Sequence, residues 1–199
     1  MIIFLYGEDT FRSKQKLQEI VEEYKKVHKN GLNLIVMDCQ GADFDDLKRE
    51  LETVSMFKEK KLIILKSAFL NAEFEKSLLD YKNSLLEDKE NTIVFFEDGK
   101  ADSRKSFFKF LEKNSKSQEF KPLSWPQSLT FAKKEFEKYG VKIQSEALEQ
   151  LVIFCGSDLW RLSNEIKKLA AFKIDSAIDL KDVEQMVNSE IETDIFKTI

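Results

Sequence analysis

The sequence has 199 residues and few chain breakers, with only two prolines and six glycines against 42% hydrophobic and 34% charged residues. This composition excludes a generally disordered chain and is typical of a folded, helix-rich protein, long enough for one large domain or two small ones. The net charge of -4 comes from lysine and glutamate interleaved along most of the chain, which argues against a broad nucleic-acid-binding or lipid-binding face.

Five short runs of β-forming residues begin about 30 residues apart along the first part of the sequence. They cover residues 1–6, 33–38, 61–66, 92–97 and, more weakly, 118–121. Segments with helical periodicity separate them, such as the one that holds Phe107, Phe108 and Leu111. Strands and helices alternating at this spacing predict an α/β domain whose mostly parallel sheet is covered by helices on both faces.

After Pro122 the strand signals give way to helix signals, which predicts one domain over residues 1–124 and a helical domain over residues 125–188. Turn and capping residues mark the helices of this second domain. The predicted helices run from Pro126 to before Gly140, from Ser145 to Gly156, from Ser157 or Asp158 through Phe172, and from Asp179 to about Val187.

The last stretch, residues 189–199, has an apolar helical face with nothing left in the sequence to cover it. The face consists of Ile191, Ile195, Phe196 and Ile199. We expect this stretch to begin a third, C-terminal domain that is missing. The alternative is a short tail that packs back on the helical domain.

No apolar run reaches the roughly 20 residues that a transmembrane helix needs. The strand-like run after Met1 has no basic leader and no cleavage site, so a cytoplasmic protein without a signal peptide is expected. Cys39 and Cys155 lie far apart in apolar contexts, which predicts two buried thiols in a reducing compartment rather than a disulfide.

The turn after the first strand is where a P-loop protein would bind phosphate, so the glycine-rich pattern can be tested there position by position. Starting the pattern at Gly7 puts residues 12–14, Arg-Ser-Lys, where a glycine, a lysine and a serine or threonine are required. Glu8 and Asp9 add carboxylates that suit a helix N-terminus and would repel a phosphate. A capping role for these acids is therefore favoured over nucleotide binding.

Other candidate sites have weaker support. Glu97 and Asp98 follow an apolar run, as magnesium-binding acids do, but without a phosphate cradle a solvated turn before Gly99 is favoured. The single histidine, His28, lies among lysines and is predicted to be a surface residue. Neither a metal site, nor a cofactor, nor catalytic machinery is expected.

Lysines near residue 135 could meet phosphates of DNA, but the residue pattern favours another interpretation. Lys133, Lys134 and Lys138 alternate with Glu135 and Glu137. Mixed charges at this spacing are typical of a solvated helix face, so no DNA site is assigned.

A connecting segment before the third strand holds Val54, Ser55, Met56 and Phe57. A flexible thioether beside an aromatic ring suits insertion into a hydrophobic pocket of a partner. The alternative is that Met56 and Phe57 pack under the edge of the sheet, and residue types alone favour that alternative.

Short stretches spread along the sequence share one likeness. They are residues 4–9 with Phe11, residues 55–57 followed by 60–65, Gly140, Ile143 and Ala147 followed by residues 156–159, residues 164–169, and residues 194–196. In this order and spacing they resemble the delta subunit of bacterial DNA polymerase III, the clamp-loader subunit that opens the sliding clamp.

This resemblance implies an AAA+-like fold without ATPase activity, followed by a lid-type helical domain and a third domain that joins the loader subunits. It also implies that Met56 and Phe57 contact the clamp while Val54 and Ser55 orient them, which favours insertion over packing. Some family members have leucine where this chain has Met56, a replacement of similar volume. The implied partners are the sliding clamp (beta), the gamma/tau ATPase and delta prime subunits, and DNA only within the assembled complex, with no membrane and no cofactor.

Two further hypotheses stay open. The chain could be an adaptor of similar fold in another assembly, or a nucleotide-binding enzyme with a divergent phosphate loop. Magnesium-dependent ATP binding would favour the enzyme, whereas recovery of the clamp from an extract would separate the two adaptors.

Overall fold

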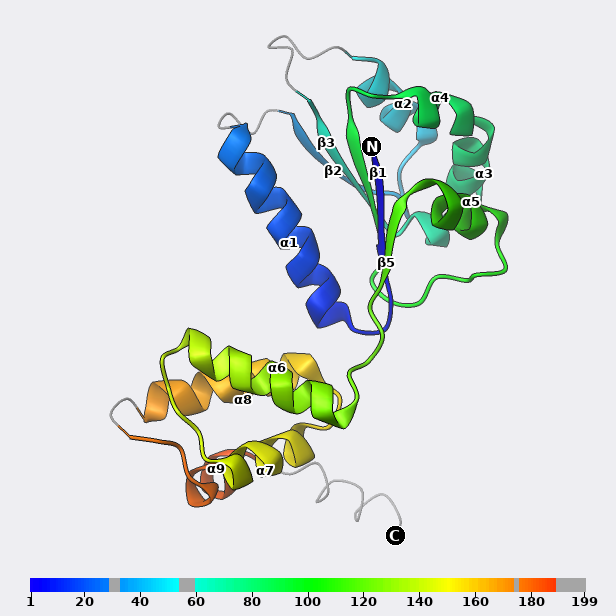
Figure 1. Ribbon diagram of the computed structural model, residues 1–199. Helices are drawn as coiled ribbons and strands as arrows, with labels where there is room; N and C mark the ends of the chain where they lie inside the picture. The colour runs from blue at the N-terminus through cyan, green and yellow to red at the C-terminus, as the bar shows by residue number, and fades with distance from the viewer. Residues whose placement is uncertain (29–32, 54–59, 174–175, 189–199) are drawn as a thin grey trace. The chain divides into compact units, whose positions relative to one another are not determined.

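The chain folds into two units, Met1–Lys121 and Pro122–Ile199 (Figure 1). The computed structural model describes residues 1–28, 33–53, 60–173 and 176–188. The predicted contact residues Val54, Ser55, Met56 and Phe57 lie outside these ranges, as does the predicted start of a third domain at residues 189–199.

The first unit is built on a five-stranded sheet in which all strand pairs are parallel. Its strands are β1 (Ile2–Tyr6), β2 (Leu34–Asp38), β3 (Leu62–Lys66), β4 (Thr92–Phe96) and β5 (Lys116–Glu119), in the order β2-β3-β4-β1-β5. The central strands β3 and β4 are buried along nearly their whole length, as strands covered on both faces must be. The predicted parallel α/β sheet is therefore confirmed.

The weak fifth strand was predicted two residues too late in the chain. Residues 118–121 carry the sequence signal, but β5 spans Lys116–Glu119 and pairs with β1, with Lys116 opposite Ile3. All four residues of β5 are exposed, because it is an edge strand. A polar edge strand lacks the apolar alternation that fixes strand positions in a sequence.

Helices cover both faces of this sheet (Figure 1). One face packs against α1 (Thr10–Val27) through Leu17, Ile20 and Val21. The other face carries the remaining helices and a short 3-10 turn: α2 (Phe44–Glu52), η1 (Ala68–Leu70), α3 (Ala72–Asp80), α4 (Lys82–Glu87) and α5 (Ser106–Asn114).

Phenylalanines fill the core beneath these four helices. Phe4 of β1 lies 5.6 Å from Phe108 of α5, ring centre to ring centre, and Phe69 lies 5.1 Å from Phe107. Such tilted and edge-on pairs add to the free energy gained by burying large apolar side chains. The core thus fixes where the carboxyl ends of β1 and β4 lie, and these ends position the site described below.

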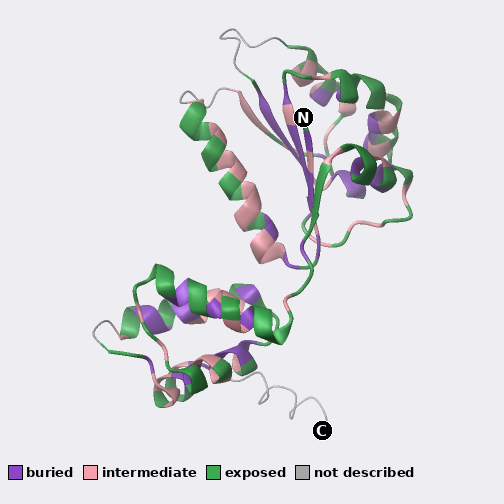
Figure 2. Cartoon of the chain, in the orientation of Figure 1, coloured by how far each residue is buried: buried purple, intermediate pink, exposed green. Residues whose placement is uncertain are grey.

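The second unit consists of helices: α6 (Trp125–Lys138), α7 (Ser145–Cys155), α8 (Leu159–Phe172) and α9 (Leu180–Met186). Local chemistry sets their ends, since Ser124 forms a capping box with Gln127 and the side chain of Asp158 accepts from the amide of Arg161. Gly156 ends α7 at a φ of 62°. The four predicted helices are confirmed, and buried and exposed residues alternate along the helices of this unit (Figure 2).

The charges of α6 differ in one respect from the sequence prediction. Lys133, Lys134 and Glu137 are exposed, as a solvated helix face requires. Glu135 is instead buried, and its carboxylate pairs with the ammonium group of Lys138. The prediction of a uniformly solvated face is wrong at Glu135, because alternating charges along the sequence do not record which residue faces the neighbouring helices.

Both thiols are buried as predicted, and Cys39 and Cys155 are not joined in a disulfide. Burial, together with the negative charges of Glu97 and Asp38, raises the pKa of the Cys39 thiol to about 12. Across the described ranges, every helix is too short or too polar to span a bilayer.

Candidate functional site

The turn between β1 and α1 lies where a phosphate-binding loop would be expected, and three of its amides are already bonded within the protein. The amide of Gly7 donates to the carbonyl of Gly99 at 2.8 Å, and that of Asp9 to the carbonyl of Phe120 at 2.9 Å. The amide of Thr10 donates to the carbonyl of Glu8 at 3.0 Å. Phosphate loops work by pointing such amides at the ligand, so these three are not available to one.

The side chains of Asp9 and Arg12 also hold this turn in place. Asp9 is buried and accepts from the backbone amide of Arg12 at 3.0 Å, which confirms its predicted capping role. The guanidinium of Arg12 then donates from Nε to Asp9 at 2.5 Å and from Nη2 to the carbonyl of Lys121 at 2.5 Å. Arg12 stands where a P-loop has its second glycine, and here it ties the start of α1 to the end of the sheet unit.

Gly7 is required at this turn by two independent constraints. Its φ is +133°, which residues with a side chain rarely adopt. A Cβ atom at this position would lie 2.3 Å from the carbonyl oxygen of Phe120, which is backbone and cannot move aside. The glycine that resembles the start of a phosphate loop is thus explained by close packing against Phe120.

A cleft of about 390 Å³ opens beside the turn, at the carboxyl ends of β1 and β5. It is lined in part by Tyr6, Phe108, Glu112, Lys100 and Lys121. Its two lysines are paired, Lys100 with Glu8 and Lys121 with Glu119, so the lining has little uncompensated positive charge. Burial, together with the negative charges of Glu119 and Glu112, raises the pKa of the Tyr6 hydroxyl.

Glu97, at the end of β4, departs from the sequence prediction. A solvated turn was expected, but the side chain is only 6% exposed, and the prediction is wrong for this residue. Burial raises its pKa to about 7, although hydrogen bonds from the amides of Phe69 and Ala68 oppose that rise. Asp98 is exposed as predicted and pairs with Lys14 at 2.7 Å. Within the described ranges, no cluster of three potential metal ligands occurs.

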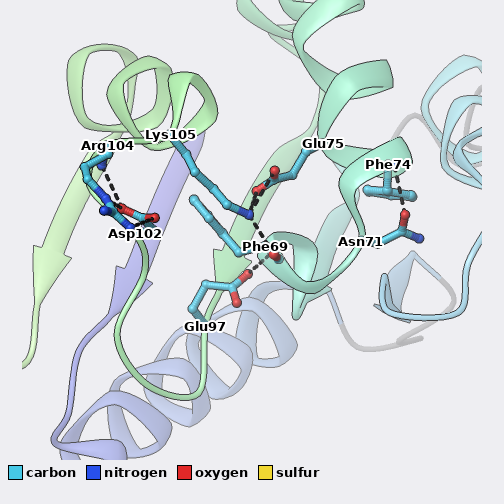
Figure 3. A network of polar contacts seen from close by, with 8 residues as sticks. All are labelled: Phe69, Asn71, Phe74, Glu75, Glu97, Asp102, Arg104 and Lys105. Atoms are coloured by element: carbon cyan, nitrogen blue, oxygen red, sulfur yellow. Dashed lines mark hydrogen bonds and ion pairs between the residues drawn. The ribbon is translucent and has the colours of Figure 1, made fainter.

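The carboxylate of Glu97 belongs to a polar network at the carboxyl ends of β3 and β4 (Figure 3). It accepts from the amide of Phe69 at 3.3 Å, while the carbonyl of Phe69 accepts from the ammonium of Lys105 at 3.0 Å. Lys105 also pairs with Glu75 of α3 at 2.9 Å. These contacts join β4, η1, α3 and α5, so the network stabilises this edge of the sheet.

The predicted partner-contact segment can be located only by its described neighbours. Thr53, which ends α2, donates from its amide and its hydroxyl to the carbonyl of Arg49 at 3.0 and 2.6 Å. On the other side, the buried ammonium of Lys61 donates to the carbonyl of Glu50 at 2.5 Å. The hydroxyl of Tyr24 donates to the carbonyl of Lys60 at 2.8 Å. The described residues on either side of positions 54–59 are therefore held by hydrogen bonds.

The sequence patterns did not indicate the contacts between distant segments that stabilise this turn. The bond from Arg12 to Lys121 spans 109 residues of sequence, and Gly7 meets Phe120 across a similar interval. The one sequence signal for the role of Arg12 was the mismatch to the phosphate-loop pattern, in which this position is a glycine. The contact between Arg12 and Lys121 depends on the pairing of β1 with β5, and the sequence pattern predicted β5 two residues too late.

Comparison with known proteins places the chain in a family. The family model described as DNA polymerase III, delta subunit, matches residues 4–121. DNA polymerase III subunit delta of Bacillus subtilis (strain 168) is 28% identical over 204 residues, covering 98% of this chain and 59% of that protein. The solved structure of the Bacillus subtilis DNA clamp loader delta protein (YqeN) matches with a TM-score of 0.63 and 27% identity, over 98% of this chain and 60% of that one. The chain thus spans about 60% of the length of these relatives.

More distant structures support the fold alone. The Thermotoga maritima RuvB Holliday junction branch migration motor matches with a TM-score of 0.60 at 13% identity, over 100% of this chain and 67% of that one. Domain III of the Thermotoga maritima replication initiation protein DnaA matches with a TM-score of 0.54 at 15% identity, over 94% of this chain and 84% of that one. The predicted AAA+-like sheet domain with a small helical domain after it is confirmed. Because the family model covers more than half of the sequence, the chain belongs to the DNA polymerase III delta subunit family.

Proposed function

We propose that this chain binds a sliding clamp through Met56 and Phe57, with Val54 and Ser55 orienting them, and that it does so without hydrolysing ATP. In this proposal the chain works as one subunit of a clamp loader, and other subunits of that loader supply the ATPase activity. The chain contacts DNA only within the assembled complex. The observation that carries the proposal is the closed β1–α1 turn in a chain of the delta family.

The absence of ATPase activity is supported by the chemistry of that turn. A triphosphate there would need amides that Gly7 and Asp9 already give to backbone carbonyls. It would also meet the carboxylates of Glu8 and Asp9, and repulsion between like charges raises the cost of binding. No lysine stands at the position that would neutralise the phosphates, since Ser13 occupies it and is buried.

Clamp binding is supported by the relative described as a DNA clamp loader delta protein, together with the residue types of the segment. Burying a methionine and a phenylalanine in an apolar pocket contributes about 3 to 6 kcal/mol before ordering costs are subtracted. The anchors at Thr53 and Lys61 lower those costs, because both ends of the segment are held by hydrogen bonds. Such a contribution is enough for recognition, whereas opening a ring needs the surrounding surface as well.

The purified chain is expected to show no saturable binding of ATP in the presence of magnesium. Isothermal titration calorimetry measures this directly. The Arg12→Ala variant should not bind either, because removing the guanidinium leaves the carboxylates of Glu8 and Asp9 in place. Saturable, magnesium-dependent binding by the wild-type chain would contradict the proposal and favour an enzyme with a divergent phosphate loop.

The Met56→Ala, Phe57→Ala double variant is expected to bind the sliding clamp of the same organism at least about 100-fold more weakly, as is typical when paired central apolar contacts are removed. Surface plasmon resonance with the immobilised clamp gives the affinity. A matched control is Val36→Ala with Leu70→Ala, which removes two apolar side chains that are 54% and 66% exposed elsewhere on the same unit. Unchanged affinity of the Met56, Phe57 variant, with a circular dichroism spectrum like that of the wild type, would remove these residues from the function.

A further inference from the structure

A shallow apolar groove runs over the outer surface of α3, α4 and α5, the helices that lie together on one face of the sheet (Figure 1). Its volume is about 420 Å³, within the range of sites that hold small ligands or a few side chains. Leu79 of α3, Leu86 of α4 and Phe110 of α5 form the apolar part of its lining. Leu79 and Phe110 also pack against the core, while Leu86 is 46% exposed.

Positive charge surrounds this apolar lining. Lys82 of α4 and Lys109 and Lys113 of α5 line the groove, and none of the groove residues within the described ranges carries a carboxylate. Lys109 and Lys113 are one helical turn apart, so they stand on the same face of α5.

These three lysines differ from others on the same unit. Lys14, Lys105 and Lys121, for example, each form an ion pair with an acidic side chain. In the part of the chain that the structure describes, the ammonium groups of Lys82, Lys109 and Lys113 form none. The groove therefore combines exposed apolar surface with uncompensated positive charge, in a protein whose net charge is -4.

We propose that this groove binds a short acidic segment of a partner protein that carries bulky apolar side chains. The apolar side chains lie on Leu79, Leu86 and Phe110, and the carboxylates pair with Lys82, Lys109 and Lys113. Charge complementarity favours an acidic segment. The apolar lining favours a peptide over a nucleic acid, because a phosphate backbone would pair with the lysines but leave the leucines exposed. This inference does not depend on clamp binding, because its residues lie outside 54–57.

The test is fluorescence anisotropy with a labelled peptide that alternates aspartate with leucine and phenylalanine. Saturable binding to the whole 199-residue chain is expected. Binding should weaken about tenfold or more when each aspartate of the peptide is replaced by asparagine, and by a similar factor in the Lys109→Glu, Lys113→Glu variant, because lost attraction becomes repulsion. The Leu86→Ser variant should weaken binding without preventing folding, since this leucine is 46% exposed.

The matched control is Lys133→Glu with Lys134→Glu, which makes the same change of net charge on exposed residues of the other unit. It should bind the peptide like the wild type, and so should the Met56→Ala, Phe57→Ala variant. Equal peptide affinity of the Lys109, Lys113 variant and the wild type would overturn the proposal. It would equally be overturned if a single-stranded oligonucleotide bound more tightly than the peptide and lost its binding in the Lys109, Lys113 variant, because the lysines would then serve a nucleic acid.

Discussion

Replacing Gly7 by alanine is expected to lower the free energy of unfolding of the sheet unit by roughly 3 to 6 kcal/mol, the sum of a strained backbone and an overpacked contact. The backbone would have to hold alanine at a φ of +133°, and the new Cβ would lie 2.3 Å from the Phe120 carbonyl oxygen. Domains are stable by only about 5 to 15 kcal/mol, so this one methyl group would remove much of the stability. Urea unfolding followed by far-UV circular dichroism measures the change.

Two other glycines separate the contributions of strain and contact. Gly99 has a φ of +136° but no atom within 4 Å of an added Cβ, so Gly99→Ala should cost only the strain, roughly 1 to 3 kcal/mol. Gly41 has the same open space without a positive φ, so Gly41→Ala should change stability by less than about 1 kcal/mol. If Gly7→Ala were no more damaging than Gly99→Ala, the packing of the turn against Phe120 would not be a determinant of stability.

Replacing Glu97 by glutamine is expected to stabilise the protein at pH 8 by about 1 to 3 kcal/mol, since the pKa of this carboxyl rises from 4.5 to about 7 on folding. A raised carboxyl pKa means that the folded state pays for an ionised, buried group. That cost is fully present above pH 7, declines as the pH falls from 7 to 4.5, and is absent below 4.5, where this carboxyl is protonated in the folded and the unfolded chain alike. Glutamine keeps an oxygen to accept from the amide of Phe69 and carries no charge.

The measurement is the free energy of unfolding of both proteins between pH 8 and pH 5. The advantage of the Glu97→Gln variant should shrink as the pH falls, because the wild-type carboxyl becomes neutral in the same range. Asp98→Asn is the matched control on the adjacent, exposed residue, and its difference from the wild type should not follow that curve. Parallel pH profiles for Glu97→Gln and the wild type would mean that burial does not govern this carboxyl.

Local chemistry made most of the fold predictable. Capping residues such as Asp158 and Asp179 act within one helical turn, so the helices of the second unit could be placed from a few consecutive residues. The apolar runs of β3 and β4 likewise signalled strands buried on both faces. Elements whose signal is contained in their own sequence were predicted within one or two residues.

Contacts between distant segments could not be predicted from such local signals. The burial of Glu97 depends on Phe69 and on the helices over this edge of the sheet, whereas its own neighbours read as a polar turn. Glu135 was misjudged for the same reason, since the packing of α6 against other helices decides which face is covered. The candidate contact residues Met56 and Phe57 rest on residue types and on family likeness, and for them the decisive partner is a different molecule.

The distribution of aromatic side chains gives this protein a convenient optical property. Both tryptophans of the sequence, Trp125 and Trp160, belong to the unit that begins at Pro122, and each is nearly half exposed. Excitation at a wavelength that tryptophan absorbs and tyrosine does not therefore gives emission from that unit alone, because the sheet unit contains Tyr6, Tyr24 and Tyr81 but no tryptophan. A fluorophore of longer emission wavelength, attached near residue 54 or beside the α3–α5 groove, would add a second colour without removing the first.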